Sequence, residues 1–134
     1  MTEVRQNLAM QRTYRVLKRI YPSVYISAAV IFVVMLFWAG SKPIAVGLFP
    51  FPFNYIAHIL AYSFLTLSLW FGGKERWPLF IIILVSTIGA LDEIHQIYLA
   101  GRHPAFLDFA IDSVSSWFTV GFLKEVGLGL SEMS

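Results

Sequence analysis

The chain has 134 residues, of which 57% are hydrophobic and 13% are charged. Ordinary soluble domains carry about 25% charged residues, so this composition indicates a membrane protein rather than a soluble domain. The net charge of +2 is too small to indicate a nucleic-acid partner, and the lack of cysteine excludes disulfides, thiolate metal sites and cysteine nucleophiles.

The first 22 residues form a basic segment. Half of the ten basic residues lie in the first nineteen positions: Arg5, Arg12, Arg15, Lys18 and Arg19. Apolar side chains recur at helical spacing on the opposite face, at Met10, Tyr14, Leu17 and Tyr21. This pattern predicts a basic amphipathic helix lying on the inner leaflet of a membrane. A disordered basic tail is the alternative.

Four apolar stretches follow, and each approaches the roughly 20 helical residues that cross a bilayer core. They cover residues 23–40, 54–72, about 77–99 and about 104–123. Pro22 suits a first helical turn, and Asn54 is expected to cap the second helix. The short connection "GKER" makes the second and third helices an antiparallel hairpin.

The sequence therefore predicts an all-α membrane protein with four transmembrane helices in an antiparallel bundle. The bundle spans residues 23–124, preceded by the basic segment 1–22 and followed by a short tail, 125–134. Orientation follows from the excess of basic residues on the cytoplasmic side of membrane proteins. With a cytoplasmic N-terminus, only Lys42 and Arg102 of the ten basic residues face outward. We expect a multi-pass protein of the cell membrane with both termini in the cytoplasm.

Residues 91–112 hold four of the eight acidic residues of this apolar chain. Residues 77–91 carry no charge, which gives about 22 Å of helix at 1.5 Å per residue. A hydrocarbon core is about 30 Å thick. The third helix must therefore carry its polar end into the outer leaflet: Asp92, Glu93, His95 and Gln96.

The neighbouring helices place polar groups at the same depth. His58 and Tyr62 lie about 6 and 12 Å below the outer end of the second helix, and Asp108 and Asp112 lie at about the same two depths on the fourth. A carboxylate at mid-bilayer costs about 2.5–3.5 kcal/mol. The four carboxylates are therefore expected to face inward. They are also expected either to be paired with His58, His95 or Arg102 or to be partly protonated.

Three motifs in this region, "HILAY", "DEIHQIYLAGR" and "DFAID", resemble the VanZ-like family of small bacterial membrane proteins. The resemblance covers residues 54 to about 122, and the matching positions are His58, Tyr62, Asp92, Glu93, His95, Gln96, Gly101, Arg102 and Asp108. The chain departs from the family pattern at five positions: Asn54 and Tyr55 replace an Asp-Lys pair, Asp112 replaces an asparagine, and Ser115 and Ser116 replace glycines.

The resemblance implies a function in the cell envelope. The founding member of the family lowers sensitivity to the lipoglycopeptide teicoplanin. By analogy, the polar layer would be an outward-facing pocket for a membrane lipid, for a lipid-linked cell-wall precursor or for a glycopeptide antibiotic. Such a protein would contribute to antibiotic resistance or to envelope maintenance.

The candidate ligand-binding residues are His58, Tyr62, Asp92, Glu93, His95, Gln96, Arg102, Asp108 and Asp112. Arg102 and the histidines suit a phosphate, whereas His103 is expected to be a solvated loop residue. The alternative is a membrane enzyme acting on an isoprenoid-linked or phospholipid substrate, with acid–base catalysis by His95, Asp92 or Glu93. No serine has a nucleophile signature.

Three further interpretations stay open. A divalent metal such as Zn²⁺ or Mn²⁺ could be held by His58, His95, Asp92 and Asp108, although the spacing is not H-E-x-x-H. Carboxylate–histidine chains also serve as proton relays in membranes. Finally, the polar groups could form a buried network that only fixes how the helices align.

The orientation predicts a simple labelling pattern in this cysteine-free chain. A cysteine introduced at residue 102 should react with an impermeant reagent added to intact cells, and one at residue 74 should not. Reaction at residue 74 without reaction at residue 102 would show that the protein has the opposite orientation.

Overall fold

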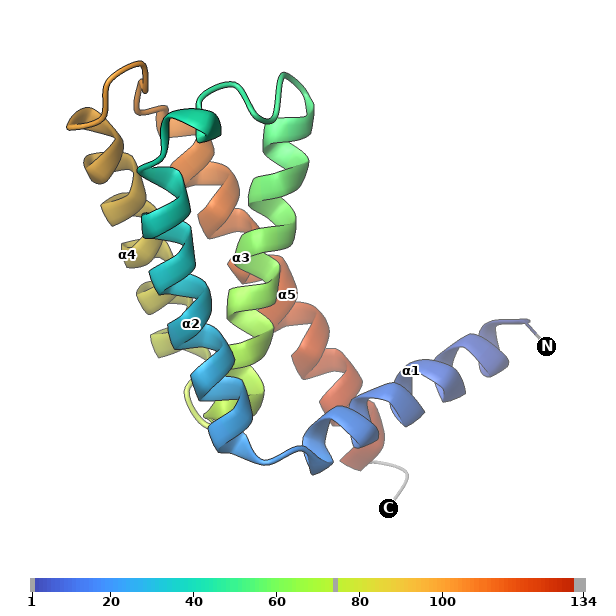
Figure 1. Ribbon diagram of the computed structural model, residues 1–134. Helices are drawn as coiled ribbons and strands as arrows, with labels where there is room; N and C mark the ends of the chain where they lie inside the picture. Colours follow the sequence, from blue (N-terminus) through green and yellow to red (C-terminus); the bar gives the residue numbers. More distant parts are fainter. Residues whose placement is uncertain (1, 74, 132–134) are drawn as a thin grey trace.

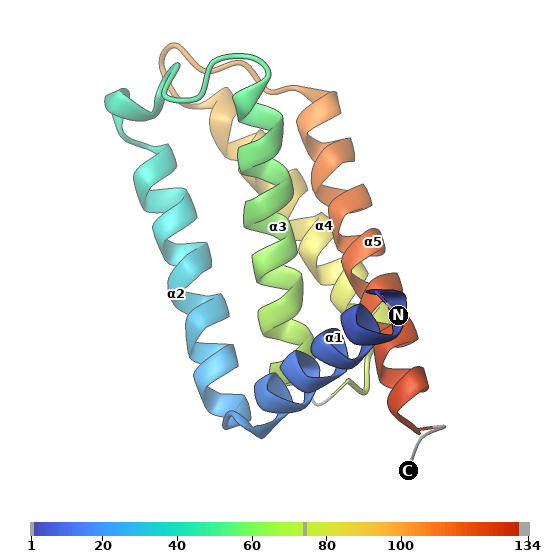
Figure 2. The ribbon, with the colours of Figure 1, turned by 90° about the vertical axis from the view of Figure 1, so that its right-hand side faces the viewer.

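A computed structural model describes residues 2–73 and 75–131, and within these ranges all the regular structure is helical. The elements in chain order are α1 (Thr2–Arg19), α2 (Pro22–Gly40), the 3-10 helix η1 (Pro43–Ala45), α3 (Phe53–Gly72), α4 (Pro78–Ile97) and α5 (Phe106–Ser131). Helices α2 to α5 run side by side as an antiparallel bundle, and α1 leaves one end of it at an angle (Figures 1 and 2). The predicted all-α architecture is confirmed.

The helix boundaries follow local chemistry. Pro22 and Pro78 are the first residues of α2 and α4, where a fixed φ and a missing N–H cost nothing. The expected cap by Asn54 is wrong: α3 begins one residue earlier, at Phe53, and no side chain caps it. Helix α5 continues past the expected end near Leu123 to Ser131.

The bundle has two distinct ends, one beside the 3-10 helix η1 and the other beside α1. The "η1 end" carries residues 41–52 and 98–105, which connect α2 to α3 and α4 to α5. The "α1 end" carries α1, the short connection from α3 to α4 and the C-terminal part of α5 (Figure 1). The polar layer predicted from the sequence lies toward the η1 end.

The bundle is apolar outside and partly polar inside. Large apolar side chains such as Val34, Phe80 and Phe118 are exposed on α2, α4 and α5, whereas Asp112 and Ser116 are completely buried. A soluble protein shows the opposite distribution. Four helices, α2 to α5, are long and apolar enough to cross a membrane. The chain is therefore a multi-pass membrane protein.

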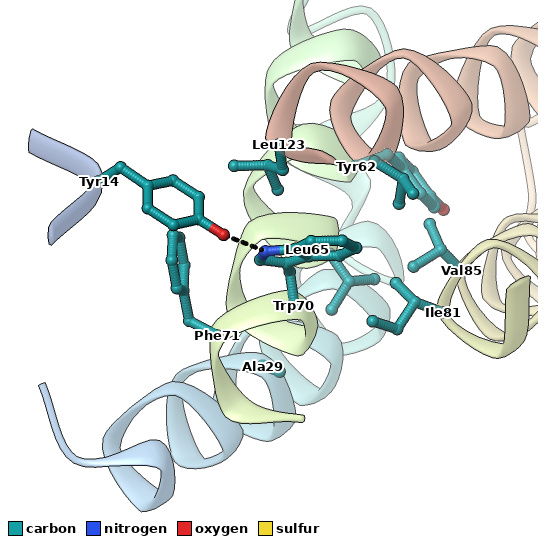
Figure 3. Packing of buried hydrophobic residues seen from close by; sticks show 10 residues of the cluster. Tyr14, Ala29, Tyr62, Leu65, Trp70, Phe71, Ile81, Val85 and Leu123 are labelled. Atoms are coloured by element: carbon teal, nitrogen blue, oxygen red, sulfur yellow. Dashed lines mark hydrogen bonds between the residues drawn. The ribbon is translucent and has the colours of Figure 1, made fainter. Parts of the chain in front are cut away.

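Helix α3 forms the centre of the bundle and α2 its periphery. Leu65 of α3 and Val85 of α4 are completely buried in the apolar core (Figure 3). Only 6% of the apolar span of α2 is buried inside the protein, compared with 33% of that of α3. Two aromatic pairs hold α2 against α3: Tyr25–Phe71 and Phe32–Phe64, with ring centroids 5.3 and 5.2 Å apart. Toward the η1 end, α2 instead forms one wall of a cavity.

The basic segment is helical, and Tyr14 is one of the residues that fix it to the bundle. Tyr14 of α1 is buried, and Trp70 of α3 donates a hydrogen bond from Nε1 to its hydroxyl at 3.3 Å (Figure 3). Burial raises the pKa of the Tyr14 hydroxyl to about 12, so it stays neutral at physiological pH. The predicted apolar face is only half correct, because Tyr14 and Leu17 pack on the core while Met10 and Tyr21 are exposed.

Candidate functional site

A histidine–aspartate pair joins α3 to α5 within the membrane-spanning region. His58 Nδ1 lies 2.8 Å from Asp112 Oδ1, and the Asp112 side chain has no exposed surface. An ionised carboxylate can only accept, so His58 donates through Nδ1. The bond compensates part of the large cost of removing a carboxylate from water. It also fixes the orientation of the imidazole, and with it the direction of the other ring nitrogen, Nε2.

That second nitrogen faces another carboxylate. His58 Nε2 is 3.8 Å from Asp108 Oδ2, too far for a hydrogen bond but close enough for electrostatic attraction. Asp108 and Asp112 are four residues apart and share a face of α5. One imidazole thus lies between two carboxylates, and only the deeper carboxylate is hydrogen-bonded to it.

A second cluster lies on the last turns of α4. Gln96 Nε2 donates to Asp92 Oδ2 and to Glu93 Oε1, each at 3.3 Å. Glu93 Oε2 accepts a hydrogen bond from the backbone N–H of Ala105 at 2.7 Å. This bond satisfies a backbone donor just before α5 and holds the connecting loop on α4. Glu93 therefore has a structural contact that accounts for its burial.

A cavity of about 600 Å³ opens between α2, α3, α4 and the connections at the η1 end. Most of the predicted site residues line it: His58, Tyr62, Asp92, His95, Gln96, Arg102 and Asp108. Glu93 and Asp112 do not line the cavity, although each is hydrogen-bonded to a residue that does. Helix α2 and the loop after it contribute apolar side chains, among them Phe32, Leu36, Val46 and Phe49. The cavity thus combines a polar wall with an apolar one.

Arg102 is the permanently charged cation among the residues that line the cavity. Its guanidinium donates to the carbonyl oxygen of Gly40 at 3.3 Å, which ties the loop after α4 to the C-terminus of α2. The buried Nε makes no hydrogen bond with any residue of the described ranges. A guanidinium offers five donors in a plane that matches phosphate and carboxylate oxygens. Arg102 therefore keeps donor capacity for a ligand.

Other buried polar atoms around the cavity also lack partners. In the described part of the chain, the Tyr62 hydroxyl and His95 Nδ1 form no hydrogen bond of ordinary geometry. Tyr62 is only 1% exposed, and its ring stacks on that of His58 with an interplanar angle of 1°. Buried polar groups are nearly always satisfied in native proteins. Unsatisfied groups around a cavity are typical of a binding site.

The sequence pattern missed several lining residues. Asn54 and His103 both line the cavity, although we expected the first to be a helix cap and the second to be a solvated loop residue. His103 is exposed, so that expectation is half right. The apolar wall from α2 could not be found, because Phe32 and Leu36 look like any lipid-facing residues of a transmembrane helix.

The metal interpretation gains no geometric support. The candidates were His58, His95, Asp92 and Asp108. Within residues 2–73 and 75–131, no three histidine, aspartate or glutamate side chains converge as metal ligands would.

Comparison with known proteins adds no identity. No family model, curated protein or solved structure matches the chain. The function is therefore inferred from the site itself.

Gly89 of α4 makes the close approach of the helices at this site possible. A Cβ atom at this position would lie 3.1 Å from Asp112 Oδ2, 3.2 Å from Asp112 Cβ and 3.5 Å from Tyr62 Cε1. The two contacts with Asp112 are tighter than ordinary packing, and the Asp112 Cβ cannot move without its helix. A glycine at position 89 therefore brings α4 against the His58–Asp112 pair.

Gly89→Val should consequently destabilise the bundle by about 1–3 kcal/mol, the usual cost of overpacking. Gly121→Val in α5 is the matched control, because a Cβ there meets nothing within 4 Å. Thermal unfolding in mild detergent measures both. Equal losses at the two positions would show that the space around Gly89 is not limiting.

Proposed function

We propose that the cavity at the η1 end binds the head group of a cell-envelope lipid. One observation carries this proposal: a single cavity of about 600 Å³ has both a cationic group with free donor capacity, Arg102, and an apolar wall from α2. Guanidinium groups bind phosphate oxygens strongly, and apolar side chains within a bilayer suit acyl chains. An amphiphile with a phosphate at its head matches both halves of the cavity.

The location completes the proposal. The excess of basic residues in the N-terminal segment supports a cell-membrane protein with both termini in the cytoplasm. The η1 end would then face outward, and the cavity would reach lipids of the outer leaflet. This side of a bacterial membrane also carries lipid-linked cell-wall precursors.

The resemblance to the VanZ-like family supports the same assignment. Its motif positions His58, Tyr62, Asp92 and Arg102 all line the cavity. A glycopeptide antibiotic is the other occupant that the resemblance suggests, and binding it would contribute to resistance. The lipid is the better match to the apolar wall on α2.

One observation favours an enzyme as a second candidate. Asp112 fixes the His58 ring so that Nε2 faces the cavity side, beside Asp108. A buried carboxylate that orients an imidazole is a common arrangement for general acid–base catalysis. In this case His58, rather than His95, Asp92 or Glu93, would transfer the proton on a phospholipid or isoprenoid-linked substrate.

Lipid retention tests the proposal. The full-length protein, purified in mild detergent and analysed by native mass spectrometry, should retain a phosphate-containing lipid, and Arg102→Ala should reduce its retention about tenfold or more. Hydrogen bonds to charged groups contribute about 1.5–3 kcal/mol, which corresponds to at least that factor.

Lys42→Ala is the matched control. Lys42 belongs to the same end of the bundle, but it stacks over Trp38 at 4.8 Å and does not line the cavity. Equal lipid retention by the two variants would contradict the proposal. Conversion of the bound lipid to a product of different mass during incubation would favour the enzyme.

A further inference from the structure

The cavity has more negative than positive groups deep in its wall. Asp92 and Asp108 both line it, and Asp112 lies directly behind. Arg102 donates to the Gly40 carbonyl. In the described ranges, the one side chain within ion-pair distance of any of these carboxylates is His58. A single imidazole cannot neutralise three carboxylates.

Asp92 and Asp108 are the two carboxylates with unused capacity. Asp92 is 7% exposed, and its hydrogen-bond partner is the neutral amide of Gln96 at 3.3 Å. Asp108 is 3.8 Å from an imidazole that is already hydrogen-bonded to Asp112. Each ionised carboxylate accepts about four hydrogen bonds. In the described ranges Asp92 accepts one hydrogen bond and Asp108 accepts none, so most of these acceptor positions have no donor from the protein.

A buried hydroxyl in the same wall has unused hydrogen-bonding capacity. The Tyr62 side chain is 1% exposed and lines the cavity, and its hydroxyl forms no hydrogen bond of ordinary geometry in the described part of the chain. Charged groups within a membrane normally pair with each other or line a water-filled path. Two carboxylates in the lining of one cavity, with a tyrosine between their helices, form a suitable surface for a group that carries several N–H donors and a positive charge.

We propose that Asp92 and Asp108 form a second subsite that binds a primary ammonium group, so that the ligand carries an ammonium beside its phosphate. This inference rests on the proposed lipid-binding function and names its head group as an ethanolamine type. The phosphate lies at Arg102 and the ammonium lies deeper, between the two carboxylates. A primary ammonium has three donors and a compact charge. A trimethylated ammonium has no donor, and a glycerol head group has no charge to offer.

The lipid preference of the unmodified protein gives the first test. Native mass spectrometry of the full-length chain in mild detergent compares phosphatidylethanolamine, phosphatidylcholine and phosphatidylglycerol with identical acyl chains. The ethanolamine lipid should bind about tenfold more tightly than either of the others. Equal binding of the ethanolamine and glycerol lipids would overturn the inference. Protonated, neutral carboxylates would give that result, because they offer no charge to an ammonium group.

Asp108→Asn gives the second test. This variant should reduce binding of the ethanolamine lipid about tenfold and leave binding of the glycerol lipid unchanged, because only the ammonium contact is lost. Glu125→Gln is the matched control, since it removes a carboxylate from an exposed position on the same helix. An unchanged preference in Asp108→Asn would also overturn the inference. If this variant does not fold, the comparison of lipids on the unmodified protein still decides.

Two further results separate the sources and the levels of the proposal. Soluble phosphoethanolamine should compete with the lipid if the head group alone is recognised, and should fail to compete if the acyl chains are required. A protein that binds the glycerol lipid through Arg102 but shows no ethanolamine preference refutes the ammonium subsite and leaves the proposed function intact. A protein that binds none of the three lipids refutes both.

Discussion

The bond between His58 and Asp112 is the interaction on which this arrangement of helices depends. It joins α3 to α5 at 2.8 Å, with a carboxylate that has no contact with solvent. Breaking such a pair leaves an uncompensated buried charge, which typically costs about 3–5 kcal/mol. The pairing therefore fixes the rotation of α3 and α5 about their axes. It also turns Tyr62, one helical turn further along α3, to the same side.

Several neighbouring features follow from this pair. Helix α4 must approach it closely, and Gly89 provides the room. With α4 in that position, Asp92 and Gln96 reach the cavity, and Glu93 reaches the backbone before α5 to hold the loop that carries Arg102. Helix α2 contributes little to the core and instead closes the cavity with apolar side chains. A polar wall held by α3, α4 and α5 thus faces an apolar wall on the peripheral helix, which is the arrangement that an amphiphilic ligand requires.

Much of this was predictable because depth in a membrane is a matter of counting residues. The lengths of the apolar stretches predicted the four helices, and the positions of His58, Asp92 and Asp108 along them predicted one shared polar layer. Counting cannot tell which groups meet, since that depends on helix rotation and on the contact at Gly89. The positions of the carboxylates predicted that they pair with His58, His95 or Arg102, but not that Asp112 in particular pairs with His58, or that Glu93 binds a backbone N–H instead of a ligand. The α2 wall was also invisible, because lipid-facing and cavity-facing apolar residues look alike.

The protonation of His58 tests the central interaction most directly. Nitrogen-15 NMR of the protein labelled at its three histidines resolves protonated from unprotonated ring nitrogens, and the spectrum of His58→Gln assigns the His58 signals. A hydrogen bond to the ionised carboxylate of Asp112 requires a proton on Nδ1, whether the ring is neutral or cationic. We predict a protonated Nδ1 that loses its hydrogen-bond shift in Asp112→Ala. An unprotonated Nδ1, or a signal that does not respond to Asp112→Ala, would contradict this account.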